Sequence, residues 1–198
     1  MTNKGWKQFT PLYFYTTVAL CLGFLAARAK LSISHILILL VVGVLSWGLI
    51  EYGLHRFIFH YHARSRLGVK LLYQVHLSHH EDPEAVNRLF ASLLLSTPIA
   101  STYWLLAWAV TGSWAAASYL FIGMASGYFY YEWLHFQCHH RTSRLRFLKY
   151  LRKYHLLHHY KTPGLRFGVT SPLFDLVFGT FRAPLQQRSF SGSRPASE

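Results

Sequence analysis

The chain has 198 residues, of which 52% are hydrophobic, 17% aromatic and only 14% charged. The length suggests one domain or little more, and so few charges argue against an ordinary soluble domain. A formal net charge of +13 could suggest a nucleic-acid partner, but the sequence contains no recognisable nucleic-acid-binding module.

Long apolar stretches explain this composition. A helix needs about 20 predominantly apolar residues to cross the hydrocarbon core of a membrane. On this basis we predict four transmembrane helices, at about residues 10–27, 34–59, 89–111 and 114–136. The first is short and could instead be a signal anchor, although it lacks a convincing cleavage site.

The basic residues indicate how these helices are oriented. If both termini are cytosolic, all 20 lysines and arginines except Arg28 and Lys30 lie on the cytosolic side, in agreement with the positive-inside rule. We expect residues 141–153 to form a basic helix on anionic lipid, or alternatively to receive an acidic redox partner. The tail at 185–198 is predicted to be disordered, which leaves residues 1–184 as a single membrane domain.

Ten of the 13 histidines form four short groups near the predicted cytosolic helix ends. They are His55 and His60; His76, His79 and His80; His135 and His139; and His155, His158 and His159. Two groups have the pattern HxxHH, and positions i, i+3 and i+4 of a helix share one face. We therefore expect each motif to point three imidazoles the same way. The first pair, five residues apart, would share a face only if the helix end unwinds; otherwise its members would serve different ions.

Ten imidazoles exceed the coordination capacity of one ion, which rarely takes more than about six ligands, and suit two ions with about five each. The interval from His60 to His76 equals that from His139 to His155, which supports a paired site. Isolated histidines are usually ordinary core or surface residues, but four groups at metal-ligand spacing are difficult to explain in that way. The predicted fold is an all-α membrane protein whose cytosolic helical cap holds a di-metal site.

Imidazole suits zinc, copper, iron and nickel. We favour two iron ions with dioxygen as co-substrate, because oxidation of an unactivated C–H bond requires a strong oxidant; zinc could replace iron during purification. Glu51 and Glu132 precede His55 and His135 by about one helical turn, so each could hydrogen-bond to a ligand histidine or pair with a cytosolic arginine. Cys138 could supply a thiolate ligand, but so many imidazoles make this unnecessary.

Four stretches resemble the fatty acid hydroxylase superfamily, most closely the fatty acid (dihydroceramide) 2-hydroxylases. They are HRFIFHYH at 55–62, VHLSHH at 75–80, GYFYYEWLHFQCHH at 127–140 and KYHLLHHYKTPGLRFGVTSPLFDLVFGTF at 153–181. The resemblance covers residues 51–181 and implies that the ten grouped histidines bind two metal ions, leaving His35, His62 and His140 as non-ligands. It also implies a cavity between the transmembrane helices that an acyl chain enters from the membrane.

The same resemblance implies a role in substrate handling for a Tyr-x-x-Tyr-Asp stretch, whose places are occupied here by Tyr128, Tyr131 and Glu132. Glu132 replaces the aspartate of that stretch and is one methylene longer, so a different head group or a different position of the chain is possible. The tyrosines could instead anchor the helix at the membrane interface. Family members often carry a cytochrome b5 domain, for which this chain has no room. We therefore expect a separate cytochrome b5-like or ferredoxin-like electron donor. An acidic donor could dock on the basic residues Arg144, Arg146 and Lys149.

The predicted function is O2-dependent di-iron hydroxylation of a lipid acyl chain, at C2 of a long-chain fatty acid or acyl lipid. The alternative is a sterol- or carotenoid-type hydroxylase or desaturase of the same superfamily, although the FGVTSPLFDLVFGTF stretch favours the acyl branch. A non-enzymatic metal transporter should place its ligands at mid-membrane, whereas these lie at the inner boundary. The expected location is a bacterial inner membrane or the endoplasmic reticulum, and the small size favours the former.

Overall fold

The computed structural model describes residues 9–184, a range without β-strands. The predicted disordered tail at 185–198 lies outside the described residues. The long helices are α1 (Thr10–Ala26), α2 (Ile33–Gly53), α5 (Leu93–Thr111) and α6 (Trp114–His140), and the shorter ones are α3 (Arg66–Leu72), α4 (Ser78–Glu81), α7 (Arg146–Tyr160) and α8 (Leu173–Val177). Two π-helical segments, η2 (Leu54–Phe59) and η3 (Tyr73–Leu77), and a 3-10 turn, η4 (Val86–Arg88), complete the set.

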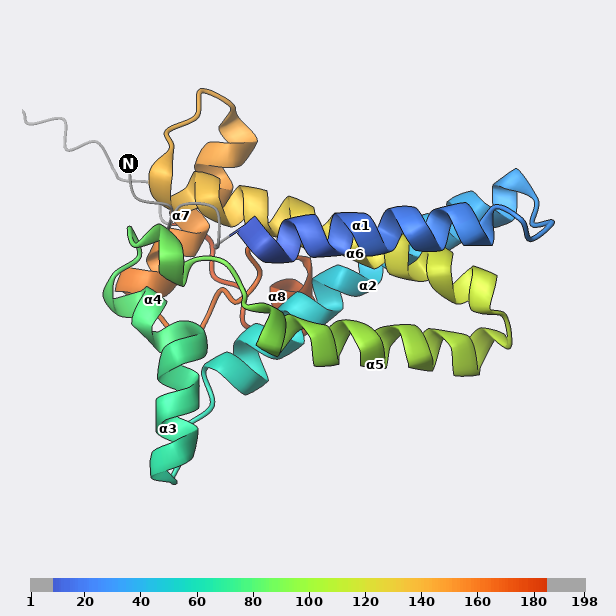
Figure 1. Cartoon of the computed structure of the whole chain (residues 1–198). Helices are drawn as coiled ribbons and strands as arrows, with labels where there is room; N and C mark the ends of the chain where they lie inside the picture. The colour runs from blue at the N-terminus through green and yellow to red at the C-terminus, as the bar shows by residue number, and fades with distance from the viewer. Residues whose placement is uncertain (1–8, 185–198) are drawn as a thin grey trace, which may run out of the picture.

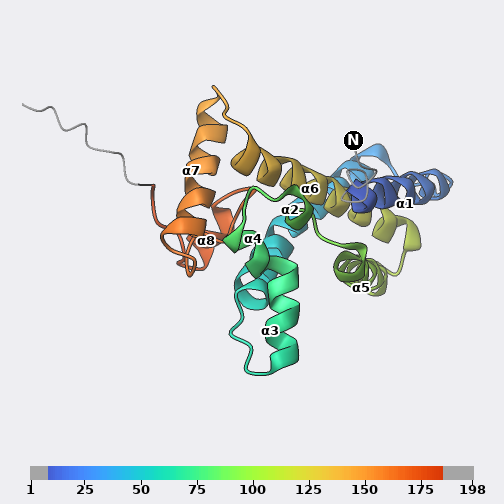
Figure 2. The same ribbon diagram turned by 60° about the vertical axis from the view of Figure 1, so that its left-hand side comes forward.

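The molecule has two ends of different character. The four long helices extend together from one end, while α3, α4 and α7 gather at the other (Figure 1). The second view shows α7 standing across the end of α6 (Figure 2). The long helices therefore form a bundle, and the short helices form a cap at one end of it.

Serine residues define where four of these helices begin. The side chains of Ser32, Ser65, Ser92 and Ser113 each accept a hydrogen bond from a backbone N–H three residues further on. A serine at this position satisfies one of the unpaired N–H groups of the first turn. The cap at Ser92 makes α5 begin at Leu93, four residues after the predicted start of about residue 89. The helix ends at Gly112, which has a φ of 63°, a conformation that favours glycine.

Helix α6 is the centre of the bundle, and α1, α2 and α5 all pack against it. Where α2 crosses α6, a Cβ atom on Gly43 would lie 2.3 Å from the Leu120 carbonyl oxygen. A Cβ on Gly123 would lie 2.2 Å from the Leu40 carbonyl oxygen. Only glycine at both positions permits this backbone contact, a common device between membrane helices. The crossing fixes the position of α6 against α2. Helix α6 continues to His140, four residues beyond the predicted end at about residue 136.

The bundle has the surface of a membrane protein. Two segments, Ile33–Phe59 and Val86–Thr111, are long and apolar enough to cross a membrane, and α1 is a shorter apolar helix. Large apolar side chains on the outside are exposed, for example Leu94 at 89% and Val110 at 86%, as expected for side chains that face lipid. Most of α6 is buried inside the bundle. Four membrane spans and their orientation remain predictions.

The basic segment after α6 differs from the expectation. Residues 141–145 are not helical, and α7 begins only at Arg146. Its buried face carries His155, His158 and His159. The segment is thus partly a connection and partly a helix that brings histidines to the cap.

Candidate metal centre

The end of α2 is widened into a π turn at the first histidine pair. The His60 N–H donates to the His55 carbonyl oxygen at 3.2 Å, which is a hydrogen bond between residues five apart. A widened turn brings residues at this spacing to nearly the same side of the helix. His55 and His60 therefore join one cluster. The helix end is altered so that both can share a site, and the two histidines do not belong to different sites.

All ten grouped histidines meet in two clusters of five, and within each the candidate ligand atoms lie within 4.8 Å of one another. The first cluster contains His55, His60, His76, His80 and His158, and the second cluster contains His79, His135, His139, His155 and His159. The clusters adjoin, because the rings of His80 and His159 stack with their centroids 4.1 Å apart. The fold thus creates two neighbouring sites of equal size.

Each HxxHH motif is divided between the clusters. In α7, His155 and His159 belong to the second cluster, whereas His158 belongs to the first. The earlier motif mirrors this, since only its i+3 member, His79, reaches the second cluster. The expectation that three imidazoles point the same way is wrong, because positions i+3 and i+4 of an α-helix lie about 100° apart. The i+3 histidine of each half therefore completes the cluster of the other half.

Ring nitrogens within each cluster face one another at short range. The Nε2 atoms are 2.9 Å apart in His76–His80, 3.1 Å in His60–His158, 2.9 Å in His139–His155 and 3.0 Å in His155–His159. Two nitrogens bound at right angles, about 2.1 Å from one ion, would lie about 3 Å apart. A hydrogen bond between neutral imidazoles could account for one contact, but His155 Nε2 faces two such nitrogens and has only one proton or lone pair to offer. The spacing therefore fits metal ligation.

Several buried ring nitrogens in residues 9–184 have no hydrogen-bond partner. Among the clustered histidines they are both nitrogens of His79 and His135, Nε2 of His55, and Nδ1 of His155 and His159; Nε2 of His140, outside the clusters, is also unpaired. An unpaired buried polar atom costs free energy, and ligation by an Nε2 or Nδ1 lone pair would satisfy one nitrogen of each ring. Burial and neighbouring histidines lower the pKa of His79 from 6.5 to about 2. These imidazoles are therefore neutral near pH 7, as metal ligation requires.

Backbone carbonyls orient two histidines of the first cluster. His55 Nδ1 lies 2.6 Å from the Phe167 carbonyl oxygen, and His158 Nδ1 lies 2.7 Å from that of Leu165. Since a carbonyl only accepts, each Nδ1 must carry the proton. The Nε2 lone pair then points towards the cluster, which is the tautomer that a metal ion needs.

Two buried carboxylates hold the loop that supplies these carbonyls. Asp175 accepts the N–H groups of Phe167 at 2.9 Å and Gly168 at 2.8 Å. Glu51 accepts the N–H groups of Val169 and Thr170, and also the Thr170 hydroxyl. Contrary to the prediction from spacing, Glu51 has no hydrogen bond to a histidine within residues 9–184, and it instead supports His55 through this loop.

Glu132 also differs from the prediction. Its Oε1 accepts the Ala91 N–H at 3.3 Å and so ties the segment before α5 to α6. Within residues 9–184 neither Glu51 nor Glu132 forms an ion pair with an arginine. Pairing with a cytosolic arginine, the alternative role considered for both, is therefore excluded in this range.

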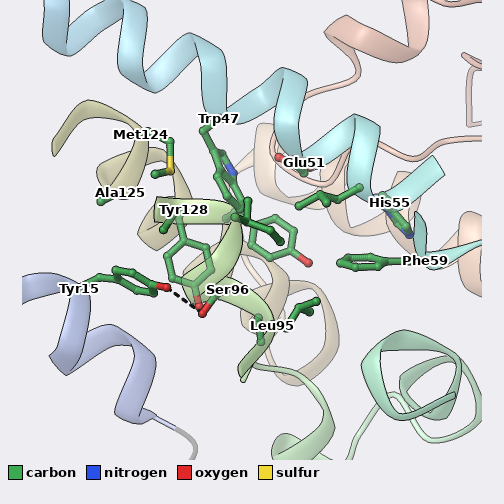
Figure 3. Close-up of a pocket in the computed structure, with 15 residues that line it drawn as sticks. Tyr15, Trp47, Glu51, His55, Phe59, Leu95, Ser96, Met124, Ala125 and Tyr128 are labelled. Atoms are coloured by element: carbon green, nitrogen blue, oxygen red, sulfur yellow. Dashed lines mark hydrogen bonds between the residues drawn. The ribbon is translucent and has the colours of Figure 1, made fainter. Parts of the chain in front are cut away.

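An apolar pocket lies among α1, α2, α5 and α6, and we call it the inner pocket (Figure 3). Its lining includes His55 of the first cluster, and it also includes Glu51, Tyr128 and Tyr131. The Tyr131 ring lies 5.4 Å from the ring of His135 in the second cluster. The two tyrosines named from the sequence are therefore wall residues of a pocket that reaches the histidines.

Other candidates lie outside the two clusters. Cys138 is buried against Leu134 and Leu151 and belongs to neither cluster. His35, His62 and His140 also belong to neither cluster. Arg144 lies just before α7, and Arg146 and Lys149 lie in its first turns; all three are exposed. The sequence reasoning missed Asp175 and the two carbonyls, whose only signal is the FGVTSPLFD stretch after the last histidines.

Comparison with known proteins agrees with this geometry. A family model described as "Fatty acid hydroxylase" matches residues 40–180. The chain is 34% identical over 160 residues to the dihydroceramide fatty acyl 2-hydroxylase FAH1 of Arabidopsis thaliana, covering 79% of this chain and 67% of the relative. It is 41% identical over 151 residues to the ceramide very long chain fatty acid hydroxylase SCS7 of Saccharomyces cerevisiae, covering 74% of this chain but only 38% of the relative.

A solved structure is also similar. It is described as full-length scs7p with only the hydroxylase domain visible, and it superimposes with a TM-score of 0.82 at 33% identity. The match covers 89% of this chain and 67% of the other. The fold is therefore shared over most of this chain.

Proposed function

The chain belongs to the fatty acid hydroxylase family, and on that basis we propose that it hydroxylates a lipid acyl chain at C2. The observation that carries the proposal is the inner pocket, an apolar space between bundle helices that ends at His55 of a ten-histidine centre. An acyl chain is the ligand that such a space suits, because the lining is almost wholly apolar. A chain in the pocket would have one end beside the histidines, where C2 would be the reacting carbon.

We propose that the two clusters each hold one iron ion, with five imidazole ligands per ion. Bound iron would supply the redox chemistry by which one oxygen atom of O2 enters the C–H bond and the other leaves as water, using two electrons from a donor and two protons from solvent. Zinc would compete for the same nitrogens and could occupy the site in purified protein.

The protein's own contribution is orientation and exclusion of water. Trp47, Tyr128 and Tyr131 line the inner pocket, where they would restrict the chain laterally and keep solvent from the reacting carbon. The Leu165 and Phe167 carbonyls would hold His158 and His55 in the ligating tautomer. The residues would thus hold the metal ligands in fixed orientations and keep water away from the bound substrate.

The remaining features complete the proposal. Residues 1–184 form one membrane domain with four spans and cytosolic termini, and the cap with its histidines faces the cytosol. Electrons come from a separate cytochrome b5-like or ferredoxin-like protein that docks near Arg144, Arg146 and Lys149, which are exposed. The relatives' names refer to acyl and ceramide substrates, which supports an acyl rather than a sterol or carotenoid substrate.

The test is mass spectrometry of fatty acids released from membranes of cells that express the chain with a reductant system. Acids carrying one additional oxygen at C2 are expected with the intact protein and not with His158→Ala. Oxidised sterols or carotenoids without oxidised acyl chains would contradict the proposal. So would the absence of any oxidised product from protein that has bound iron and an active donor.

A further inference from the structure

Tyr15 of α1 lines one end of the inner pocket. Figure 3 shows Tyr15 at the opposite side of the pocket from His55. The side chain is only 4% exposed, and its ring lies edge-on to those of Tyr128 at 5.8 Å and Phe14 at 5.2 Å. Its hydroxyl donates a hydrogen bond to Ser96 of α5 at 3.0 Å. The ring is thus held in place by both packing and a hydrogen bond.

A second apolar space lies beyond this ring, between α1, α5 and α6. We call it the outer groove. Its lining includes Val18, Leu22, Trp104, Leu105 and Phe121. The inner pocket and the outer groove have only two lining residues in common, Tyr15 and Ala100. Because alanine has a single methyl group, the Tyr15 ring is the bulk of the partition between them.

The direction of the chain follows from where the histidines lie. Of the two spaces, only the inner pocket has a histidine in its lining, namely His55. A substrate oxidised near its carboxyl end must place that end at His55, so its methyl end points towards Tyr15. The length of chain that fits is then set by where the partition stands.

We propose that Tyr15 is a chain-length stop: it ends the acyl-binding pocket and keeps the methyl end of the substrate out of the outer groove. This inference rests on the proposed function, since it assumes an acyl substrate with its reacting carbon at the histidines. Removal of the ring joins the two spaces and gives longer chains an apolar path past Ala100. Added bulk at Ala100 moves the stop towards His55.

The test compares product chain lengths from cells given an equimolar mixture of saturated fatty acids of increasing length. Tyr15→Ala should shift the 2-hydroxy products towards longer chains. We expect the ratio of the longest to the shortest product to rise about tenfold or more, because even one methylene group in an apolar pocket changes selectivity by at least about tenfold. Ala100→Leu should shift the products the opposite way. Tyr15→Phe, which keeps the ring and loses the bond to Ser96, should give a small shift towards longer chains.

Tyr13→Ala is the matched control, because Tyr13 lies on the same helix and is 56% exposed on its outer side. It should leave the chain-length distribution unchanged. A wild-type distribution from Tyr15→Ala at normal product yield would overturn the chain-length stop. If Tyr15→Ala fails to accumulate, the proposal is decided by Ala100→Leu, and an unshifted distribution there overturns it. Failure of the intact protein to form any 2-hydroxy acid would instead overturn the proposed function.

Discussion

The first and second clusters contain five histidines each, but the surrounding protein supports them differently. In the first, His55 and His158 are anchored by carbonyls of a loop that Glu51 and Asp175 hold. In the second, buried Nδ1 atoms of His79, His135, His155 and His159 have no hydrogen-bond partner within residues 9–184. The comparison shows that two sites with the same number of histidines can differ in how the surrounding protein orients those histidines. Backbone carbonyls orient two histidines of the first cluster, whereas the orientation of those in the second would depend on packing and on a bound ion.

The largest effect is expected from the two histidines that cross between the halves. His79→Ala or His158→Ala should reduce product more than about 100-fold, because loss of a direct ligand should exceed the 10–100-fold effect typical of residues that support ligands. Each variant should also lose about one ion per chain, measured by elemental analysis of protein purified with its metal. His35→Ala and His62→Ala, both exposed and outside the clusters, should retain activity. Full activity of the His158 variant would refute the assigned site.

A smaller effect is expected from the carboxylate behind the loop. Asp175→Asn removes the charge that accepts the Phe167 and Gly168 N–H groups. We expect metal affinity of the first cluster alone to fall about 10-fold to 100-fold, as is typical when a residue that supports a ligand is changed. Metal content after dialysis should therefore fall from two ions towards one. Equal loss from both clusters would show that the loop supports the whole centre and not one side of it.

Stepwise chelation tests the same asymmetry without changing the loop. We expect the second cluster to release its ion first, which leaves a one-ion form at intermediate chelator concentration. The ion that resists chelation should persist in His79→Ala, where the first cluster is intact, and disappear in His158→Ala. Release of both ions in a single step would contradict the difference between the clusters.

The smallest effect is expected at the surface of α7, whose opposite face carries histidines of both clusters. Reversal of Arg144, Arg146 and Lys149 to Glu should slow reduction by an acidic donor up to about tenfold at low salt, because steering by charge is lost. Metal content should remain at the wild-type value. A reduction rate that is unchanged across salt concentrations would remove this face from consideration as the donor dock.

Much of this arrangement could be read from residue types. Apolar runs predicted the positions of the long helices to within a few residues, and the spacing of histidines selected all ten members of the clusters. Ser92 directly precedes Leu93 and so signals the start of α5, whereas the apolar stretch itself begins earlier, at Leu89. A serine directly before an apolar run is a common helix start.

Other parts have no such signal. The π turn at His55 and His60 depends on a backbone hydrogen bond that any residue can form. The Leu165 and Phe167 carbonyls act through the main chain, so their side chains say nothing of the role. Tyr15 resembles any other aromatic residue of an apolar helix until α5 and α6 are placed beside it. The division of each HxxHH motif likewise needs the tertiary position of both halves.

That division has a consequence for how the protein is made. His158 completes the first cluster although the other four members end at His80, and His79 completes the second although the other members begin at His135. Neither cluster of five can exist until the ribosome has passed residue 158 and both helical hairpins have come together. The complete set of candidate ligands therefore assembles late in biosynthesis, and a chain truncated before His158 cannot form either cluster of five.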